Sequence, residues 1–198
     1  MDGLTLRVAI ECDNQLAETA RCSYERLRQH GHPVRYPAYR RGNLHAAWGP
    51  AATAQLAAWW RDPAFWAALP CARWAPRGLA RLGLSAGIEY VVLTQRAPAL
   101  EAVTRRWLAE HELPARRVYC LGGSLTRYAR ALAALAPDLL VADRPELVAL
   151  AQAHGIATAS LHYPWLAARP PHYVAADWLD LSQVLWRWQL THRRSSRS

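Results

Sequence analysis

Five short runs of apolar residues recur along the chain, each rich in leucine or β-branched residues. Most are followed by a segment in which apolar residues return at the spacing of one helix face. The runs cover residues 4–11, 88–94, 117–121, 138–142 and 156–161. Strands that alternate with helices form parallel sheets, so the pattern predicts an α/β fold with a Rossmann-like parallel sheet of about five strands flanked by helices.

Local signals mark the ends of several predicted helices. Pro98 precedes an apolar-periodic segment at a position where proline favours the first helical turn. Ser124 can cap a helix that presents Leu125, Tyr128, Leu132 and Leu135 to the sheet. Gly155 ends the segment that carries Leu147, Leu150 and Ala151.

One interval is too long for a simple crossover. About 75 residues, rich in tryptophan and arginine, separate the first strand from the strand that begins at Ile88. We expect a small helical insertion at 16–70, with helices at 15–30, 51–60 and 63–69. Asp62-Pro63 is a start signal for the last of them. The predicted core is then 1–15 and 71–190, followed by a basic, disordered tail at 191–198.

Polar residues follow three of the predicted strands. Glu11 and Asp13 stand two positions apart, so their carboxylates point to the same side of an extended chain. Thr94 and Asp143 follow the second and fourth runs. All four would meet at the carboxyl edge of the sheet, where open α/β folds bind ligands. Carboxylates that hold Mg²⁺ beside a hydroxyl that holds phosphate are typical of phosphoryl transfer, although such residues also cap helices.

Composition limits the classes of protein to which the chain can belong. The chain has 198 residues, which suits one domain, and a net charge of +9 that comes from arginine because the sequence contains no lysine. No apolar run approaches the roughly 20 residues that span a bilayer, and the N-terminus lacks the features of a signal peptide. We therefore expect a cytoplasmic protein with no membrane contact. The four cysteines have no zinc-like spacing and are expected to be reduced.

Three longer stretches resemble one known family. They are DPAFWAALPCARWAPRGLARLGLSAGIEYVVLTQR, the segment from TRRWLAEHELPARRVYCLGG to PDLLVADRPELVALAQAHGI, and LHYPWL. Together with the acids, they are similar to the haloacid dehalogenase (HAD) superfamily, and in particular to its 5′(3′)-deoxyribonucleotidase-like members. The resemblance covers most of residues 5–166 and identifies the insertion with that family's small helical cap.

The resemblance implies a mechanism in which a first aspartate attacks phosphorus and a second one protonates the leaving group. Position by position, it makes Asp13 the general acid, Thr94 the phosphate-binding hydroxyl and Asp143 the late metal ligand. The nucleophile position holds Glu11. Glu11, Asp13 and Asp143 are then the expected Mg²⁺ ligands. The basic phosphate-binding position falls to Arg127 or Arg130, with Arg127 nearer the helix N-terminus.

The chain departs from this pattern at several positions. Glu11 replaces aspartate, Asn14-Gln15 replaces the usual Gly-Thr or Gly-Val, and Ala142 stands where an acid is common. The added methylene of Glu11 moves the reacting oxygen, and a misplacement of about 1 Å can cost on the order of 100-fold in rate. We therefore expect a small phosphorylated ligand, such as a nucleotide, to bind with weakly held Mg²⁺ while phosphoric monoester hydrolysis is slow or absent.

Other readings stay open. A non-catalytic module could present the tryptophans of the insertion to a partner protein, or these side chains could simply pack the insertion. Nucleic-acid binding is less favoured because the aromatic residues do not alternate with arginines on one surface. A dinucleotide enzyme is disfavoured because no GxGxxG follows the first strand. An apolar helix face near the C-terminus suits either the core or a homodimer, and it contains Trp178, Leu181, Leu185 and Trp188.

Overall fold

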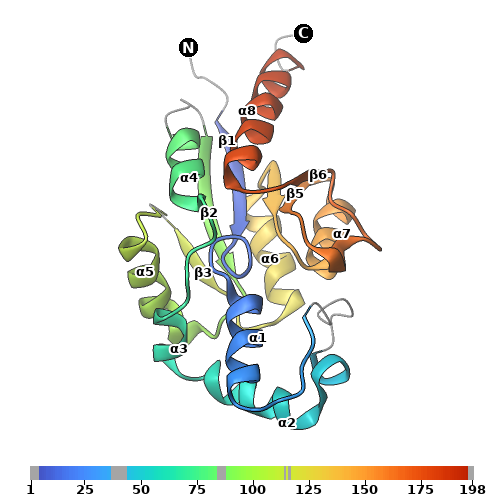
Figure 1. The fold of residues 1–198 in the computed structure, drawn as a ribbon. Coiled ribbons are helices and arrows are strands. Elements are labelled where there is room, and N and C mark those ends of the chain that lie inside the picture. The colour runs from blue at the N-terminus through green and yellow to red at the C-terminus, as the bar shows by residue number, and fades with distance from the viewer. Residues whose placement is uncertain (1–4, 37–43, 84–87, 114, 116, 196–198) are drawn as a thin grey trace.

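A single parallel sheet organises the molecule (Figure 1). The computed structural model describes residues 5–36, 44–83, 88–113, 115 and 117–195. The strand order is β3-β2-β1-β4-β5-β6. The strands are β1 (Leu6–Glu11), β2 (Ile88–Thr94), β3 (Val118–Cys120), β4 (Leu139–Val141), β5 (Ala157–Leu161) and β6 (Tyr173–Ala175). The order reverses on either side of β1, which places the ligand-binding crevice of such folds at its carboxyl end.

The predicted α/β architecture is confirmed, with one strand more than expected. All five apolar runs form strands. The sixth, β6, has three residues and follows Pro170-Pro171. Strands β3 and β4 are equally short, but they lie in the predicted runs at 117–121 and 138–142, whereas β6 lies in no such run.

Helices cover both faces of the sheet. One face packs against α6 and α7 through a core that includes Leu93, Tyr128 and Leu147. The other face packs against α4, α5 and α8 through Val92, Trp107 and Trp178. These helices are α4 (Ala75–Gly83), α5 (Glu101–Glu110), α6 (Leu125–Leu135), α7 (Pro145–Ala153) and α8 (Trp178–Ser195). Single 3-10 turns at Pro98–Leu100 and Pro164–Leu166 complete the core.

The expected boundary signals act as predicted. The Ser124 hydroxyl accepts a hydrogen bond from the Arg127 amide at the start of α6. Pro98 opens the turn that leads into α5. Gly155 has a φ of 70°, in the left-handed region, directly after α7.

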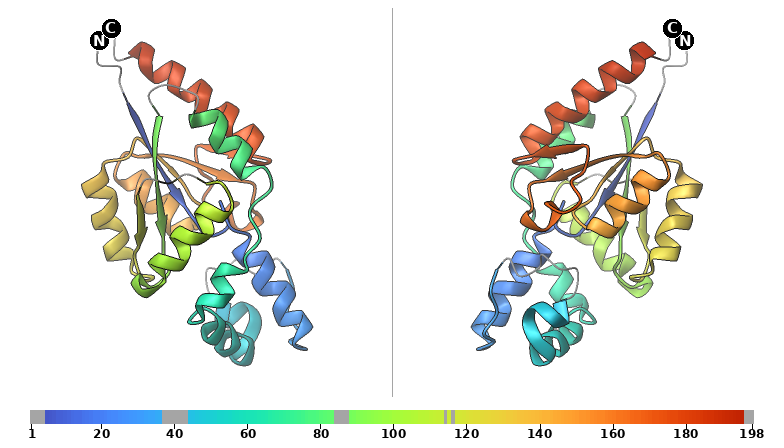
Figure 2. Two further views of the ribbon diagram at one scale, coloured as in Figure 1. Left: turned by 90° about the vertical axis from the view of Figure 1, so that its left-hand side faces the viewer. Right: turned by 90° about the vertical axis from the view of Figure 1, so that its right-hand side faces the viewer.

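Three helices lie between β1 and α4, and we call residues 19–67 the helical insertion. They are α1 (Thr19–Gln29), α2 (Leu44–Trp59) and α3 (Pro63–Ala67). Figure 2 shows them beyond the carboxyl ends of the strands, at the opposite end of the molecule from the last turns of α8. Asp62 caps α3 as expected. A helix was predicted from residue 15, but residues 15–18 are not helical. The chain first turns back there, and the amides of Leu16 and Ala17 both donate hydrogen bonds to the carbonyl of Cys12.

Tryptophan side chains pack the helical insertion. Trp48, Trp59 and Trp66 are buried, and the Trp59 ring stacks on Phe65. The break at Gly49, where φ is 80° and ψ is 169°, divides α2 into two helical pieces just before Pro50. The predicted helix at 51–60 corresponds to the second piece. Packing, and not an exposed recognition surface, thus explains these three tryptophans.

The apolar face of the C-terminal helix packs against the protein's own core. Trp178, Leu181, Leu185 and Trp188 are all buried in the main core. The helix α8 continues to Ser195, so residues 191–195 are helical and not a disordered tail, and residues 196–198 lie outside the described ranges. Within the described part of the chain, no helix combines the length and the apolar character that crossing a membrane requires. All four cysteines are free thiols.

The contact between α4 and α8 gives a test of this packing. A Cβ on Gly78 would lie 2.5 Å from the Trp178 carbonyl oxygen. We expect Gly78→Ala to lower the free energy of unfolding by about 1–3 kcal/mol, because the backbone of α8 must move. The matched control is Gly83→Ala in the same helix, where a Cβ meets nothing within 4 Å. Urea denaturation that showed the same change for both variants would contradict this packing.

Candidate functional site

Two buried acids meet where β1 and β4 end. Glu11 is the last residue of β1, and Asp143 follows β4, the strand paired with β1. Their exposed fractions are 1% and 0%. Burial raises the pKa of the Glu11 carboxyl well above its ordinary value, and the neighbouring Asp143 raises that pKa further. Burial likewise raises the pKa of Asp143 to about 7, against the opposing effect of the Asn14 hydrogen bond and the Arg144 charge.

Each of these two acids keeps one oxygen without a partner. The Oδ2 atom of Asp143 accepts hydrogen bonds from Asn14 Nδ2 at 2.8 Å and from Trp165 Nε1 at 3.1 Å. Within the described residues, Asp143 Oδ1 and Glu11 Oε2 have no hydrogen-bond partner. An unmet buried acceptor costs about 1–3 kcal/mol. Two such oxygens on adjacent acids are suited to share a hard cation.

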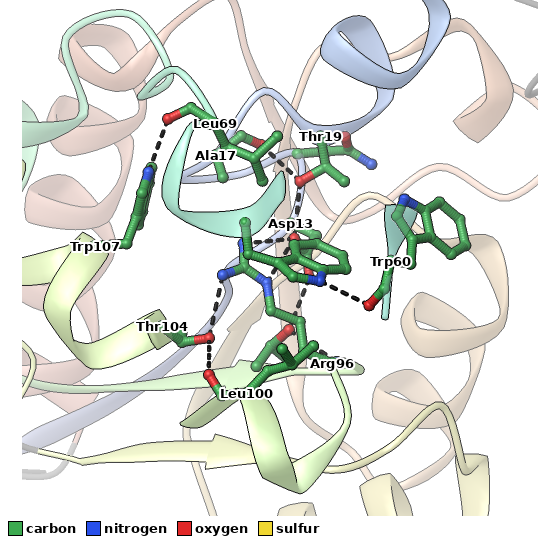
Figure 3. Close-up of polar contacts among 12 residues, drawn as sticks. Asp13, Ala17, Thr19, Trp60, Leu69, Arg96, Leu100, Thr104 and Trp107 are labelled. Carbon is green, nitrogen blue, oxygen red and sulfur yellow. Dashed lines mark hydrogen bonds and ion pairs between the residues drawn. The ribbon is translucent and has the colours of Figure 1, made fainter. Parts of the chain in front are cut away.

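Asp13, the third acid, is held by a different set of contacts (Figure 3). Its Oδ1 atom accepts hydrogen bonds from Arg96 Nε at 3.1 Å, from Arg96 Nη2 at 2.8 Å and from the Thr19 hydroxyl at 2.8 Å. Its Oδ2 atom accepts a bond from the Thr94 hydroxyl at 2.7 Å. Burial alone would raise the pKa of Asp13, but the Arg96 charge and these hydrogen bonds outweigh it and lower that pKa.

Arg96 is the residue that sequence reasoning missed. It is 3% exposed, and its guanidinium carbon lies 4.4 Å from the centroid of the Trp66 ring of α3. Its Nη1 atom donates to the Thr104 hydroxyl of α5 at 3.2 Å. Arg96 follows Thr94 by two positions, in the quoted LTQR stretch, and side chains at that spacing point to one side of an extended chain. That spacing was the sequence signal that could have placed Arg96 beside Thr94 at the site.

The two residues after Asp13 fasten the loop that carries it. Asn14 adopts a φ of 63°, in the left-handed region that asparagine tolerates. Its side chain donates to Asp143 and accepts the amide of Ala20, in the first turn of α1, at 2.7 Å. Gln15 donates to the Ser160 hydroxyl and accepts the Leu161 amide. Asn14 and Gln15 therefore tie the loop to α1, Asp143 and β5.

A pocket of about 330 Å³ joins these groups. Glu11, Asp13 and Asp143 line it from the strand ends, and Trp60 and Trp66 line it from the helical insertion. Its lining also includes two arginines, Arg96 and Arg144, together with Gln95, Gly122 and Gly123.

The remaining predicted site residues are not among the described residues that line the pocket. Thr94 is fully buried beside Asp13, and its hydroxyl donates a hydrogen bond to the Asp13 carboxylate. Arg127 and Arg130 are exposed on α6 and are not among the described lining residues. Arg127 Nη1 lies 3.3 Å from the position that a Cβ on Gly122 would take, so it borders the pocket wall.

The acids fit a cation only in part. Among the residues that the structure describes, no group of three or more histidine, cysteine, aspartate and glutamate side chains could hold a metal ion. Glu11 and Asp143 each offer a free oxygen, whereas both oxygens of Asp13 are occupied by hydrogen bonds. The donor set is therefore a pair of carboxylates and not the expected three.

Comparison with known proteins confirms the fold. No family model and no curated protein matches the chain. Among solved structures, a HAD-like family hydrolase of Streptococcus pneumoniae is 12% identical, with a TM-score of 0.64 over 93% of this chain and 100% of that one. CbbY of Rhodobacter sphaeroides, in complex with phosphate, is 15% identical, with a TM-score of 0.60 over 90% and 96%. A HAD family hydrolase of Deinococcus radiodurans, with bound phosphate and sodium, is 17% identical, with a TM-score of 0.60 over 93% and 96%. The chain has the HAD fold.

The Asp13–Arg96 ion pair can be tested by its contribution to stability. We expect Arg96→Met to lower the free energy of unfolding by about 3–5 kcal/mol, because it leaves a partly buried carboxylate without its cation. The loss should be smaller when Arg96→Met is made in an Asp13→Asn background, since no charge is then stranded. Urea denaturation of the wild type, the two single variants and the double variant measures this coupling.

The control for this cycle is Arg21→Met, which removes an arginine whose ion pairs with Glu18 and Glu25 lie at the surface. That change should stay within about 1 kcal/mol. Equal losses for Arg96→Met and Arg21→Met, or simple additivity of Arg96→Met and Asp13→Asn, would show that the pair does not anchor the site.

Proposed function

We propose that this chain binds a small phosphorylated ligand, for which a nucleotide is one candidate, together with Mg²⁺ in the pocket at the end of β1. We further propose that covalent phosphoryl transfer there is slow or absent. One observation carries the proposal. Glu11 and Asp143 each offer an unpartnered oxygen, while Asp13 is held as a carboxylate by Arg96.

Glu11 and Asp143 are the residues that would hold the cation. Magnesium prefers oxygen ligands, and their side chains supply two. When bound, the ion would supply the positive charge that an anionic ligand needs beside three acids. Asp13 takes no part in this set, because its oxygens anchor Arg96, Thr94 and Thr19.

Asp13 is poorly suited to protonate a leaving group. A general acid must carry a proton near the working pH. The lowered pKa of Asp13 means that it is ionised there. Glu11 adds a second obstacle, because its extra methylene displaces the attacking oxygen from the position that an aspartate would give it. The pocket is therefore better suited to bind a phosphate than to cleave its ester.

Several features support a phosphate as the anion. Two proteins of the same fold, CbbY and the Deinococcus hydrolase, are described with bound phosphate. In this chain, Arg144 lines the pocket with a side chain able to bind phosphate oxygens. Gly122 and Gly123, with φ values of 68° and 74°, lie just before α6 and carry no side chain that would block close approach of an anion to the backbone.

Titration calorimetry with MgCl₂, and then with inorganic phosphate in the presence of Mg²⁺, tests the proposal. We expect the wild type to bind Mg²⁺, and Glu11→Gln and Asp143→Asn to weaken that binding by more than about 10-fold, because each removes an oxygen ligand's charge. Phosphate binding should require the cation. Glu101→Gln is the control, since that glutamate pairs with Arg105 at the surface of α5.

Two outcomes would count against this function. Failure of the wild type to bind either Mg²⁺ or phosphate would refute the binding site. Rapid hydrolysis of nucleoside monophosphates or 4-nitrophenyl phosphate, abolished by Asp13→Asn, would refute slow turnover and restore Asp13 as an acid.

A further inference from the structure

Two side chains that line the pocket each carry a hydrogen-bond donor without a partner among the described residues. The donors are the indole Nε1 of Trp60 and the amide Nε2 of Gln95. Both residues line the pocket, and water reaches neither donor atom. These unmet donors contrast with the unmet acceptors of Glu11 and Asp143 in the same cavity.

A chain of contacts places Trp60 beside the Asp13–Arg96 pair, and Gln95 immediately precedes Arg96 in the chain. The Trp60 carbonyl accepts a hydrogen bond from Trp66 Nε1 at 2.8 Å, and the two indole rings lie 6.3 Å apart (Figure 3). The Trp66 ring in turn covers the guanidinium of Arg96, the residue that follows Gln95. Trp60 thus borders the cavity from the insertion, and Gln95 borders it from the segment that follows β2.

The charges around this region favour a neutral acceptor. Both donors are uncharged, and the buried cation beside them, Arg96, is already paired with Asp13. Arg144, which also lines the pocket, pairs with Glu146 at 2.7 Å. A carboxylate placed here would face three acids, while Arg96 is already paired with Asp13 and Arg144 is the cation proposed to bind the phosphate. A carbonyl oxygen accepts from an indole or amide N–H without that repulsion.

Shape adds a second constraint on the ligand. Indole rings present flat apolar surface, which favours a planar partner. The terminal amide of Gln95 turns about a broad torsion, so it can swing toward an acceptor in the cavity at small cost.

We propose that the pocket lining formed by Trp60 and Gln95, called here the donor side, selects phosphate monoesters whose organic part is planar, neutral and bears a carbonyl oxygen, and that these two are its specificity-determining residues. This inference rests on the proposed phosphate-binding function of the same pocket. It adds to that function the chemical class of the group attached to the phosphate.

Three aryl phosphates that differ at one substituent test the selection. They are phenyl phosphate, 4-carbamoylphenyl phosphate and 4-carboxyphenyl phosphate, each titrated into the full chain with Mg²⁺ by calorimetry. We expect the carbamoyl compound to bind about 5- to 30-fold more tightly than the phenyl compound, because it satisfies one or both donors. The carboxy compound should bind more weakly than the carbamoyl compound, because of its charge.

The ratio of dissociation constants between phenyl and carbamoyl compounds is the diagnostic quantity. We expect Gln95→Leu and Trp60→Phe each to move this ratio toward one, because each removes a donor while keeping apolar bulk. Gln152→Leu and Trp186→Phe are matched controls outside the pocket, and they should leave the ratio unchanged. A ratio near one in the wild type would overturn the proposal while leaving phosphate binding intact.

Benzamide, which has no phosphate, separates this inference from the proposed function. Its binding is followed through the indole N–H signal of Trp60 in NMR spectra, assigned by its loss in Trp60→Phe. A shift of that signal in the wild type, reduced in Gln95→Leu, would support the donor side even if inorganic phosphate failed to bind. No shift with benzamide, together with no carbamoyl preference among the aryl phosphates, would refute it.

Discussion

The ion pair between Asp13 and Arg96 is the interaction on which the rest of the site depends. Asp13 stands at the end of β1, and Arg96 follows β2. The arginine also packs on Trp66 of the helical insertion and bonds Thr104 of α5. A charged group this deeply buried requires a matched partner, so the pair cannot be separated without stranding a charge. Strand ends, insertion and core helix are thereby joined at one point.

This junction divides the pocket into parts with different chemistry. Around Asp13, both carboxylate oxygens are occupied and the negative charge is fixed. Around Glu11 and Asp143, one buried oxygen of each acid stays unpartnered and burial raises both pKa values. Ionising both acids is therefore costly unless a bound cation offsets their charge. Elsewhere in the pocket lining, Trp60 Nε1 and Gln95 Nε2 are donors without partners among the described residues. The arrangement suits recognition of a ligand more than protonation of its leaving group.

The sequence predicted the features that depend on local pattern. Periodicity and strand-end position predicted strands β1 to β5, the caps at Ser124 and Asp62, and the meeting of Glu11 with Asp143. Features that depend on side-chain partners did not follow. The Thr94 hydroxyl, predicted to bind phosphate, donates a hydrogen bond to Asp13. The cation paired with Asp13 is Arg96, and Arg144 lowers the pKa of Glu11 and Asp143, whereas Arg127 or Arg130 was expected. The sequence pattern alone does not indicate which of the 24 arginine side chains is buried at the site.

The protonation state of Asp13 decides between a binding pocket and a competent hydrolase. An NMR titration of the Asp13 carboxyl carbon, assigned through Asp13→Asn, measures its pKa directly in the folded protein. The structure predicts a pKa below the ordinary aspartate value, because the charge and hydrogen bonds of Arg96 outweigh the effect of burial. A lowered pKa stabilises the fold at neutral pH, and this contribution is lost only as the pH falls through it. A pKa raised toward neutrality, as a general acid requires, would contradict the account.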